Sequence, residues 1–167
     1  MMIPFLEGPG ASDLASVSRR RFLLADGLGG YSLTSPAQTR ADADHGLLVS
    51  RVNGRCYLLL ARVDEVLLVN GARVDLNTHH YRTTDAPDGF KRVVGVDLLP
   101  VPTTRFRSDE TLLERALFMI PGQAAVGLRY SLLEGPACQL ELRPLVAFRT
   151  LDARTSAHEG VAVSYTH

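Results

Sequence analysis

Apolar and polar residues alternate with a period of two along most of this chain, which is the pattern of half-buried antiparallel strands. The alternation is clearest in residues 126–132, 139–146 and 161–166. Helical periodicity is confined to one short stretch, residues 9–18, where we expect a helix. The pattern therefore predicts an all-β fold.

Two Asn-Gly pairs, Asn53-Gly54 and Asn70-Gly71, divide the first half of this pattern into hairpins. A type I′ turn needs positive φ at both central positions, and Asn-Gly is the pair that adopts it most readily. The strands predicted around these two turns are residues 49–52, 55–63, 64–69 and 72–76. Short strands joined in this way form a meander.

The rest of the chain continues the same organisation. Turn signals lie at residues 108–110, between strands predicted at residues 103–107 and 111–120, and also at Pro121-Gly122 and Gly135-Pro136. Residues 77–90 are predicted to be a long polar loop. No linker or low-complexity tract divides the chain. We therefore predict one domain, residues 1–167, folded as an antiparallel β-sandwich.

Charge and apolar content narrow the choice of partners. Basic and acidic residues number 18 each, so we expect neither nucleic acid nor an anionic membrane as a partner. A signal-peptide pattern and a membrane-length apolar run are both lacking, which predicts a cytoplasmic protein. Cys56 and Cys138 lie in strand-like runs, and we favour two buried free thiols over a disulfide.

The glycine-rich segment Asp26-Gly27-Leu28-Gly29-Gly30-Tyr31 is the most informative motif. Thr39-Arg40 and then His45-Gly46-Leu47-Leu48-Val49 follow it. Its glycines do not match G-x-G-x-x-G and no helical pattern follows, so dinucleotide binding is not predicted. On residues alone, the segment is a glycine turn between strands at residues 22–25 and 31–34.

Together these motifs resemble the N-terminal domain of bacterial and archaeal glycogen debranching enzymes of the amylo-1,6-glucosidase type. Stretches within residues 64–71, 114–130 and 142–149 resemble the same family in the same order. The resemblance implies a galactose-mutarotase-like super-sandwich, here expected to be incomplete relative to the family domain. The family's catalytic acids lie on a C-terminal α/α-barrel, so we expect no catalytic residue in this chain and a separate catalytic domain as a partner.

The resemblance also implies a carbohydrate site at the motif. Its candidate residues are Asp26, Gly29, Gly30, Tyr31, Arg40 and His45. The glycines would let the backbone approach a sugar, Tyr31 would stack on a pyranose ring, and Arg40 and His45 would bond hydroxyls. The alternative is that the glycines only shape a turn and that Arg40 pairs with a neighbouring aspartate, Asp42 or Asp44.

Three functions fit these observations. The first is a non-catalytic β-sandwich that binds α-glucan or malto-oligosaccharide without a cofactor or metal. The second is a small mutarotase-like enzyme in which His45, His79 and Glu65 act as acid and base. The third is a structural module that forms a homodimer, because residues 161–167 end the chain in a strand pattern with no later strand to pair with.

Two further arrangements of polar residues are interpreted as non-functional. Glycosidases use paired carboxylates, and the candidates here are Asp64, Glu65, Glu114 and Glu141. Glu114 and Glu141 occupy polar-face strand positions, where a solvated carboxylate is expected. The Asp42-x-Asp44-His45 cluster lacks a second set of ligands with metal-site spacing, so we interpret it as a solvated loop.

Overall fold

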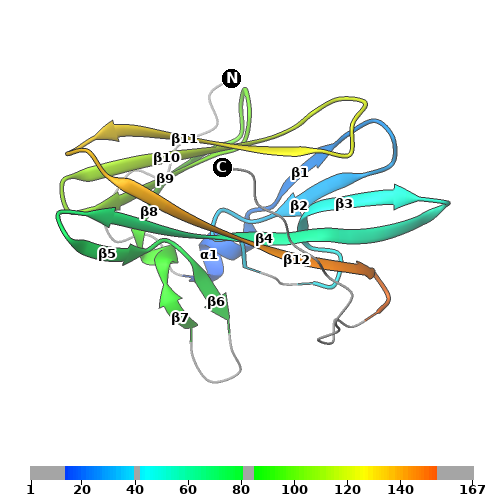
Figure 1. The fold of residues 1–167 in the computed structure, drawn as a ribbon, viewed down its shortest axis with the longest axis horizontal. Coiled ribbons are helices and arrows are strands. Elements are labelled where there is room, and N and C mark those ends of the chain that lie inside the picture. Colours follow the sequence, from blue (N-terminus) through cyan, green and yellow to red (C-terminus); the bar gives the residue numbers. More distant parts are fainter. Residues whose placement is uncertain (1–13, 40–41, 81–84, 154–167) are drawn as a thin grey trace.

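The computed structural model describes residues 14–39, 42–80 and 85–153. Two antiparallel sheets lie one over the other, and nearly all regular structure belongs to them (Figure 1). The predicted all-β sandwich is confirmed. Across the described ranges, no helix is long and apolar enough to cross a membrane.

The larger sheet is organised around one long strand, β4. Its strands are β1 (Phe22–Ala25), β2 (Tyr31–Thr34), β3 (Gly46–Val52), β4 (Arg55–Val69), β5 (Ala72–Asp75) and β12 (Gln139–Thr150). Both β3 and β5 pair with β4, at its first and second half respectively, and β12 pairs along its other edge. The predicted division of β4 after residue 63 is wrong, because neither Val63 nor Asp64 supplies the positive φ that a tight turn needs.

The two Asn-Gly turns are confirmed. Asn53 and Gly54 have φ values of 50° and 79°, and Asn70 and Gly71 have values of 51° and 76°. Positive φ at both central positions is the requirement of a type I′ turn. These turns fold β3 and β5 back onto the two ends of β4.

The smaller sheet has the strand order β11-β10-β9-β8. Its members are β8 (Val93–Asp97), β9 (Thr103–Ser108), β10 (Thr111–Met119) and β11 (Val126–Glu134). Three of these strands were predicted from the alternation, whereas the pattern had assigned no element to β8. The connection after β11 brings the chain back to the larger sheet as β12 (Figure 1).

The predicted polar loop at residues 77–90 is wrong. It contains a hairpin of β6 (Thr78–His80) and β7 (Asp85–Asp88), followed by the short 3₁₀ helix Gly89–Arg92. Such short polar strands carry no apolar alternation by which sequence could reveal them. The helix α1 (Leu14–Arg19) overlaps the predicted one; residues 9–13 and the predicted strand at residues 161–167 lie outside the described ranges.

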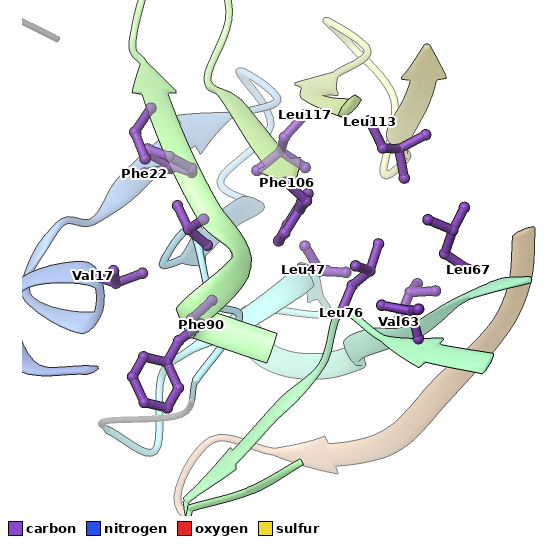
Figure 2. Packing of buried hydrophobic residues seen from close by; sticks show 14 residues of the cluster. Val17, Phe22, Leu47, Val63, Leu67, Leu76, Phe90, Phe106, Leu113 and Leu117 are labelled. Carbon is purple, nitrogen blue, oxygen red and sulfur yellow. The ribbon is translucent and has the colours of Figure 1, made fainter. Parts of the chain in front are cut away.

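The hydrophobic core lies between the two sheets. Phe106 and Leu117 of the smaller sheet belong to the same buried cluster as Leu47 and Leu67 of the larger one (Figure 2). All four side chains are at most 3% exposed. Cys138 packs against this cluster. Cys56 and Cys138 are both free thiols, as predicted, but they are only half-buried, so the prediction that they are buried holds in part.

A buried ion pair crosses this core. Glu65 of β4 and Arg115 of β10 are 1% and 5% exposed, and Nη1 of Arg115 lies 2.7 Å from Oε2 of Glu65. The other carboxylate oxygen of Glu65 accepts hydrogen bonds from Gln38 Nε2, at 3.1 Å, and from the Tyr130 hydroxyl. Arg115 also donates to the carbonyl of Pro36 at 2.6 Å. One network thus joins both sheets and the segment after β2.

We predict that Glu65→Gln lowers the free energy of unfolding by about 3–5 kcal/mol, because it leaves the Arg115 charge buried without a counter-charge. Tyr130→Phe should cost about 2 kcal/mol, the value of one hydrogen bond to a charged group. Both are measured by urea denaturation.

The control is Glu134→Gln, which breaks an ion pair with Arg107 whose two side chains are 55% and 40% exposed. That change should cost less than about 1 kcal/mol. Equal stability losses for Glu65→Gln and Glu134→Gln would show that the buried pair has no special role.

Candidate functional site

Asp26 builds the turn between β1 and β2. Its side chain is 2% exposed, and Oδ1 accepts the backbone N–H groups of Leu28 and Gly30 at 2.7 and 2.9 Å. Its own carbonyl accepts the N–H of Gly122 at 2.7 Å, which ties this turn to the β10–β11 turn. Asp and Asn side chains commonly close turns in this way. One oxygen of the Asp26 carboxylate is therefore committed to holding the backbone.

Two of the motif glycines are required by the geometry of the same turn. Gly29 has φ of 90°, a backbone conformation that residues with a Cβ atom rarely adopt. A Cβ on Gly30 would overlap Oδ2 of Asp26 and lie 2.8 Å from the carbonyl of Val49. Gly30 therefore lets Asp26 and β3 approach the turn closely, while Gly27 to Gly29 form its exposed tip.

Tyr31 connects the turn to the segment that precedes β3. It lies opposite Val49 in the β2–β3 ladder, and its hydroxyl donates to the carbonyl of Asp44 at 3.2 Å. Burial, with a smaller effect of the Asp44 carboxylate, raises the pKa of Tyr31 above its ordinary value. Tyr31 is half-buried, so part of its ring remains accessible to a ligand.

His45 is turned into the protein at the end of that segment. It is 2% exposed, and its Nδ1 accepts the N–H of Asp42 at 3.3 Å. Asp42 itself pairs with Arg21 at 2.9 Å. Arg40, the remaining candidate, lies outside the described residues. The structure thus brings the Asp26–Tyr31 turn and His45 into one unit, in which Asp26 and His45 face inward.

Arg149 is a positioning residue that the sequence did not single out. Its guanidinium is 7% exposed and donates to the carbonyl oxygens of Thr150, Leu151, Ala153 and Ala43, at 2.8 to 3.1 Å. Four backbone acceptors share this one cation, so the end of β12 is fastened to the loop before His45. Charge alone gave no signal that this arginine is buried.

The four carboxylates considered for glycosidase chemistry all face arginines. The pairs are Asp64–Arg62 at 3.2 Å, Glu65–Arg115 at 2.7 Å, Glu114–Arg105 at 3.0 Å and Glu141–Arg73 at 2.7 Å. Hydrogen bonds from Arg73 and then Arg143 lower the pKa of Glu141 to about 2. A glycosidase acid needs the opposite, a raised pKa that keeps its proton at neutral pH.

Glu65 and His79, two of the three residues considered for mutarotase-like chemistry, lie on opposite sides of β4. Glu65 points into the core, whereas its neighbour Asp64 points to the opposite face, as adjacent strand residues do. His79 of β6 lies on the side of Asp64, with Nε2 at 3.3 Å from Oδ2. The Glu65 carboxylate and the His79 ring are therefore separated by β4 itself.

Among the described residues, no group of three or more His, Cys, Asp or Glu side chains could hold a metal ion. The Asp42-x-Asp44-His45 segment is instead a turn in which the His45 ring accepts a backbone N–H.

The fold and this turn unit define a class, an antiparallel β-sandwich domain with a glycine turn packed against the segment before its third strand. The family model for the N-terminal region of glycogen debranching enzyme matches residues 20–167. The chain belongs to this family of glycogen debranching enzyme N-terminal domains. Comparison with curated proteins and with solved structures gives no significant match.

We predict that His79 makes stability depend on pH. Burial, followed by the Arg62 charge, lowers its pKa below 6.5 in the folded protein despite the nearby Asp64 carboxylate. The unfolded chain then binds the proton more readily, so the free energy of unfolding should fall as pH drops from about 6.5 through the folded pKa.

Urea denaturation of the wild type and of His79→Gln across this pH range measures the effect. The difference between the two curves isolates His79 from the other histidines. A difference that does not vary with pH, or one that favours the wild type at low pH, would contradict the assignment.

Proposed function

We propose that this chain is a non-catalytic carbohydrate-associated domain that binds α-glucan. The match to the glycogen debranching enzyme N-terminal family over residues 20–167 carries the proposal. The arginine pairing of all four candidate carboxylates supports the non-catalytic part, since each of these carboxylates already takes part in an ion pair. Chemistry on the glucan then belongs to a separate catalytic domain.

Within the motif unit, Tyr31 is the residue best placed to touch a sugar. Its ring is half-exposed beside the exposed turn tip, whereas Asp26 and His45 are occupied in holding the unit together. An aromatic ring offers an apolar face to a pyranose, and a nearby backbone offers hydrogen bonds. Gly29 is exposed at this tip, and Arg40, which lies outside the described residues, is a further candidate from the sequence motif.

We predict that the protein binds maltohexaose and releases no glucose from a 1,6-branched dextrin. Titration calorimetry measures the binding, and a glucose assay measures the turnover. Tyr31→Ala should weaken binding, while Tyr31→Phe, which keeps the ring, should preserve it.

Two results would count against this proposal. Release of glucose by the pure chain would overturn the non-catalytic role. An equal loss of maltohexaose binding in Tyr31→Ala and Tyr31→Phe would show that binding depends on the hydroxyl bond to Asp44 and not on the ring.

A second candidate is assembly into a homodimer. In the described part of the chain, β11 and β12 are the outer strands of their sheets. Leu132, Leu142 and Val146 lie opposite Leu113, Glu65 and Leu60 and so belong to the inward-facing sides, yet they are 41%, 44% and 49% exposed. Pro144 in β12 lacks an N–H, which disfavours strand addition. We therefore propose packing of side chains across a two-fold axis.

We predict a dimer in sedimentation velocity at high micromolar concentration, and a monomer for Leu142→Glu, which places a charge on the proposed contact. Leu99→Glu is the matched control, because Leu99 is 72% exposed and lies in the connection between β8 and β9. A wild type that stays at the 18.2 kDa monomer mass refutes the dimer.

A further inference from the structure

An exposed aromatic ring lies at the end of β12 on a strained backbone. Phe148 is 64% exposed and has φ of 41°, in the left-handed region that bulky side chains avoid. The β12–β4 ladder shifts register between Val146 and Arg149, so Phe148 sits in a bulge. Burial in the core does not explain a large apolar side chain at this position. Backbone strain of this kind accumulates at functional sites.

The bulge is held by the residue that follows it. Arg149 is buried, and its bonds to three carbonyls of residues 150–153 and to Ala43 fix the backbone on which Phe148 is displayed. The ring itself stacks on Tyr57 of β4, with centroids 6.2 Å apart and planes inclined by 27°. The buried Arg149 guanidinium thus holds the backbone of the bulge, and the Tyr57 ring contacts Phe148, which nevertheless stays exposed to solvent.

Polar groups border this aromatic pair. Thr150 lies directly opposite Tyr57 in the ladder, and its side chain hydrogen-bonds to Asp152. Hydrogen bonds from the Thr150 side chain and then from the backbone of Asp152 itself lower the pKa of the Asp152 carboxyl, with a smaller contribution from the Arg55 charge. Asp152 and Arg55 are both exposed. A carboxylate, a hydroxyl and a guanidinium supply the acceptors and donors that sugar hydroxyls need.

We infer that Phe148, stacked on Tyr57 and bordered by Arg55, Thr150 and Asp152, is a stacking platform for a pyranose ring of an α-glucan. The inference rests on the proposed function for the class of ligand, but it concerns a different surface. Tyr57 and Leu58 are adjacent in β4 and point to opposite faces, and the row Tyr31–Val49–Leu58–Arg149 runs along the face away from Tyr57. The platform is therefore a second contact, separate from the motif turn.

Fluorescence gives a direct test, because the chain contains no tryptophan. Phe148→Trp keeps an aromatic ring on the platform and makes it the single tryptophan of the protein. Its emission should shift on titration with maltohexaose. The matched control is Phe118→Trp, on β10 of the other sheet, where the phenylalanine is 37% exposed; its emission should not change.

Binding measured by calorimetry separates stacking from other roles of Phe148. Phe148→Leu stays apolar but loses the ring, and should weaken maltohexaose binding about tenfold, as expected for one aromatic stack. Phe148→Tyr should bind like the wild type. Phe148→Asn removes the ring with a residue that tolerates positive φ, so its melting temperature should equal or exceed that of the wild type, while maltohexaose binding weakens as much as in Phe148→Leu.

The possible failures differ from one another. If the wild type binds maltohexaose and Phe148→Leu binds equally well, the platform is wrong and the proposed function stands. If the wild type does not bind, the proposed function fails and the platform fails with it. If Phe148→Leu leaves binding intact but abolishes self-association in sedimentation, the surface is a contact between copies of this chain, and the inference is overturned.

Discussion

The Glu65–Arg115 pair is the interaction on which the rest of the structure depends. It places opposite charges on the two central strands, β4 and β10, in a core where either charge alone would be costly. The pair fixes how the sheets lie over one another, because the carboxylate must meet Arg115, Tyr130 and Gln38 at once. Apolar contacts are non-directional and would allow one sheet to shift slightly relative to the other, whereas these hydrogen bonds require one relative position.

The same network reaches the motif by way of the segment that follows β2. The carbonyl of Pro36 accepts from Arg115, and the side chain of Gln38 bonds both Glu65 and the N–H of Val63. Gln38 has φ of 52° and ends a turn in which its N–H donates to the carbonyl of Ser35 at 2.9 Å. Pro36 and Gln38, in the segment that follows β2, are therefore positioned from inside the sandwich.

Sequence predicted what local chemistry controls. Asn53-Gly54 and Asn70-Gly71 carry their own turn geometry, and alternation located β10 and β11. Sequence missed what depends on distant partners. The hairpin of β6 and β7 has no apolar pattern of its own, and the ion pair joins residues 50 positions apart. Glu65 and Arg115 look like ordinary surface charges until the sheets are stacked.

The same distinction applies to the candidate site. Sequence picked out the segment from Asp26 to Tyr31 and His45 as a unit, and the structure brings them together, but it could not show which of their polar atoms are already occupied. Asp26 Oδ1 and His45 Nδ1 each accept backbone N–H groups, so these two side chains shape the turn before they can serve a ligand. The proposed sugar contacts therefore involve groups that have accessible surface. Tyr31 and the strained, exposed Phe148 have such surface, on opposite faces of one sheet, and both owe their positions to buried polar residues behind them.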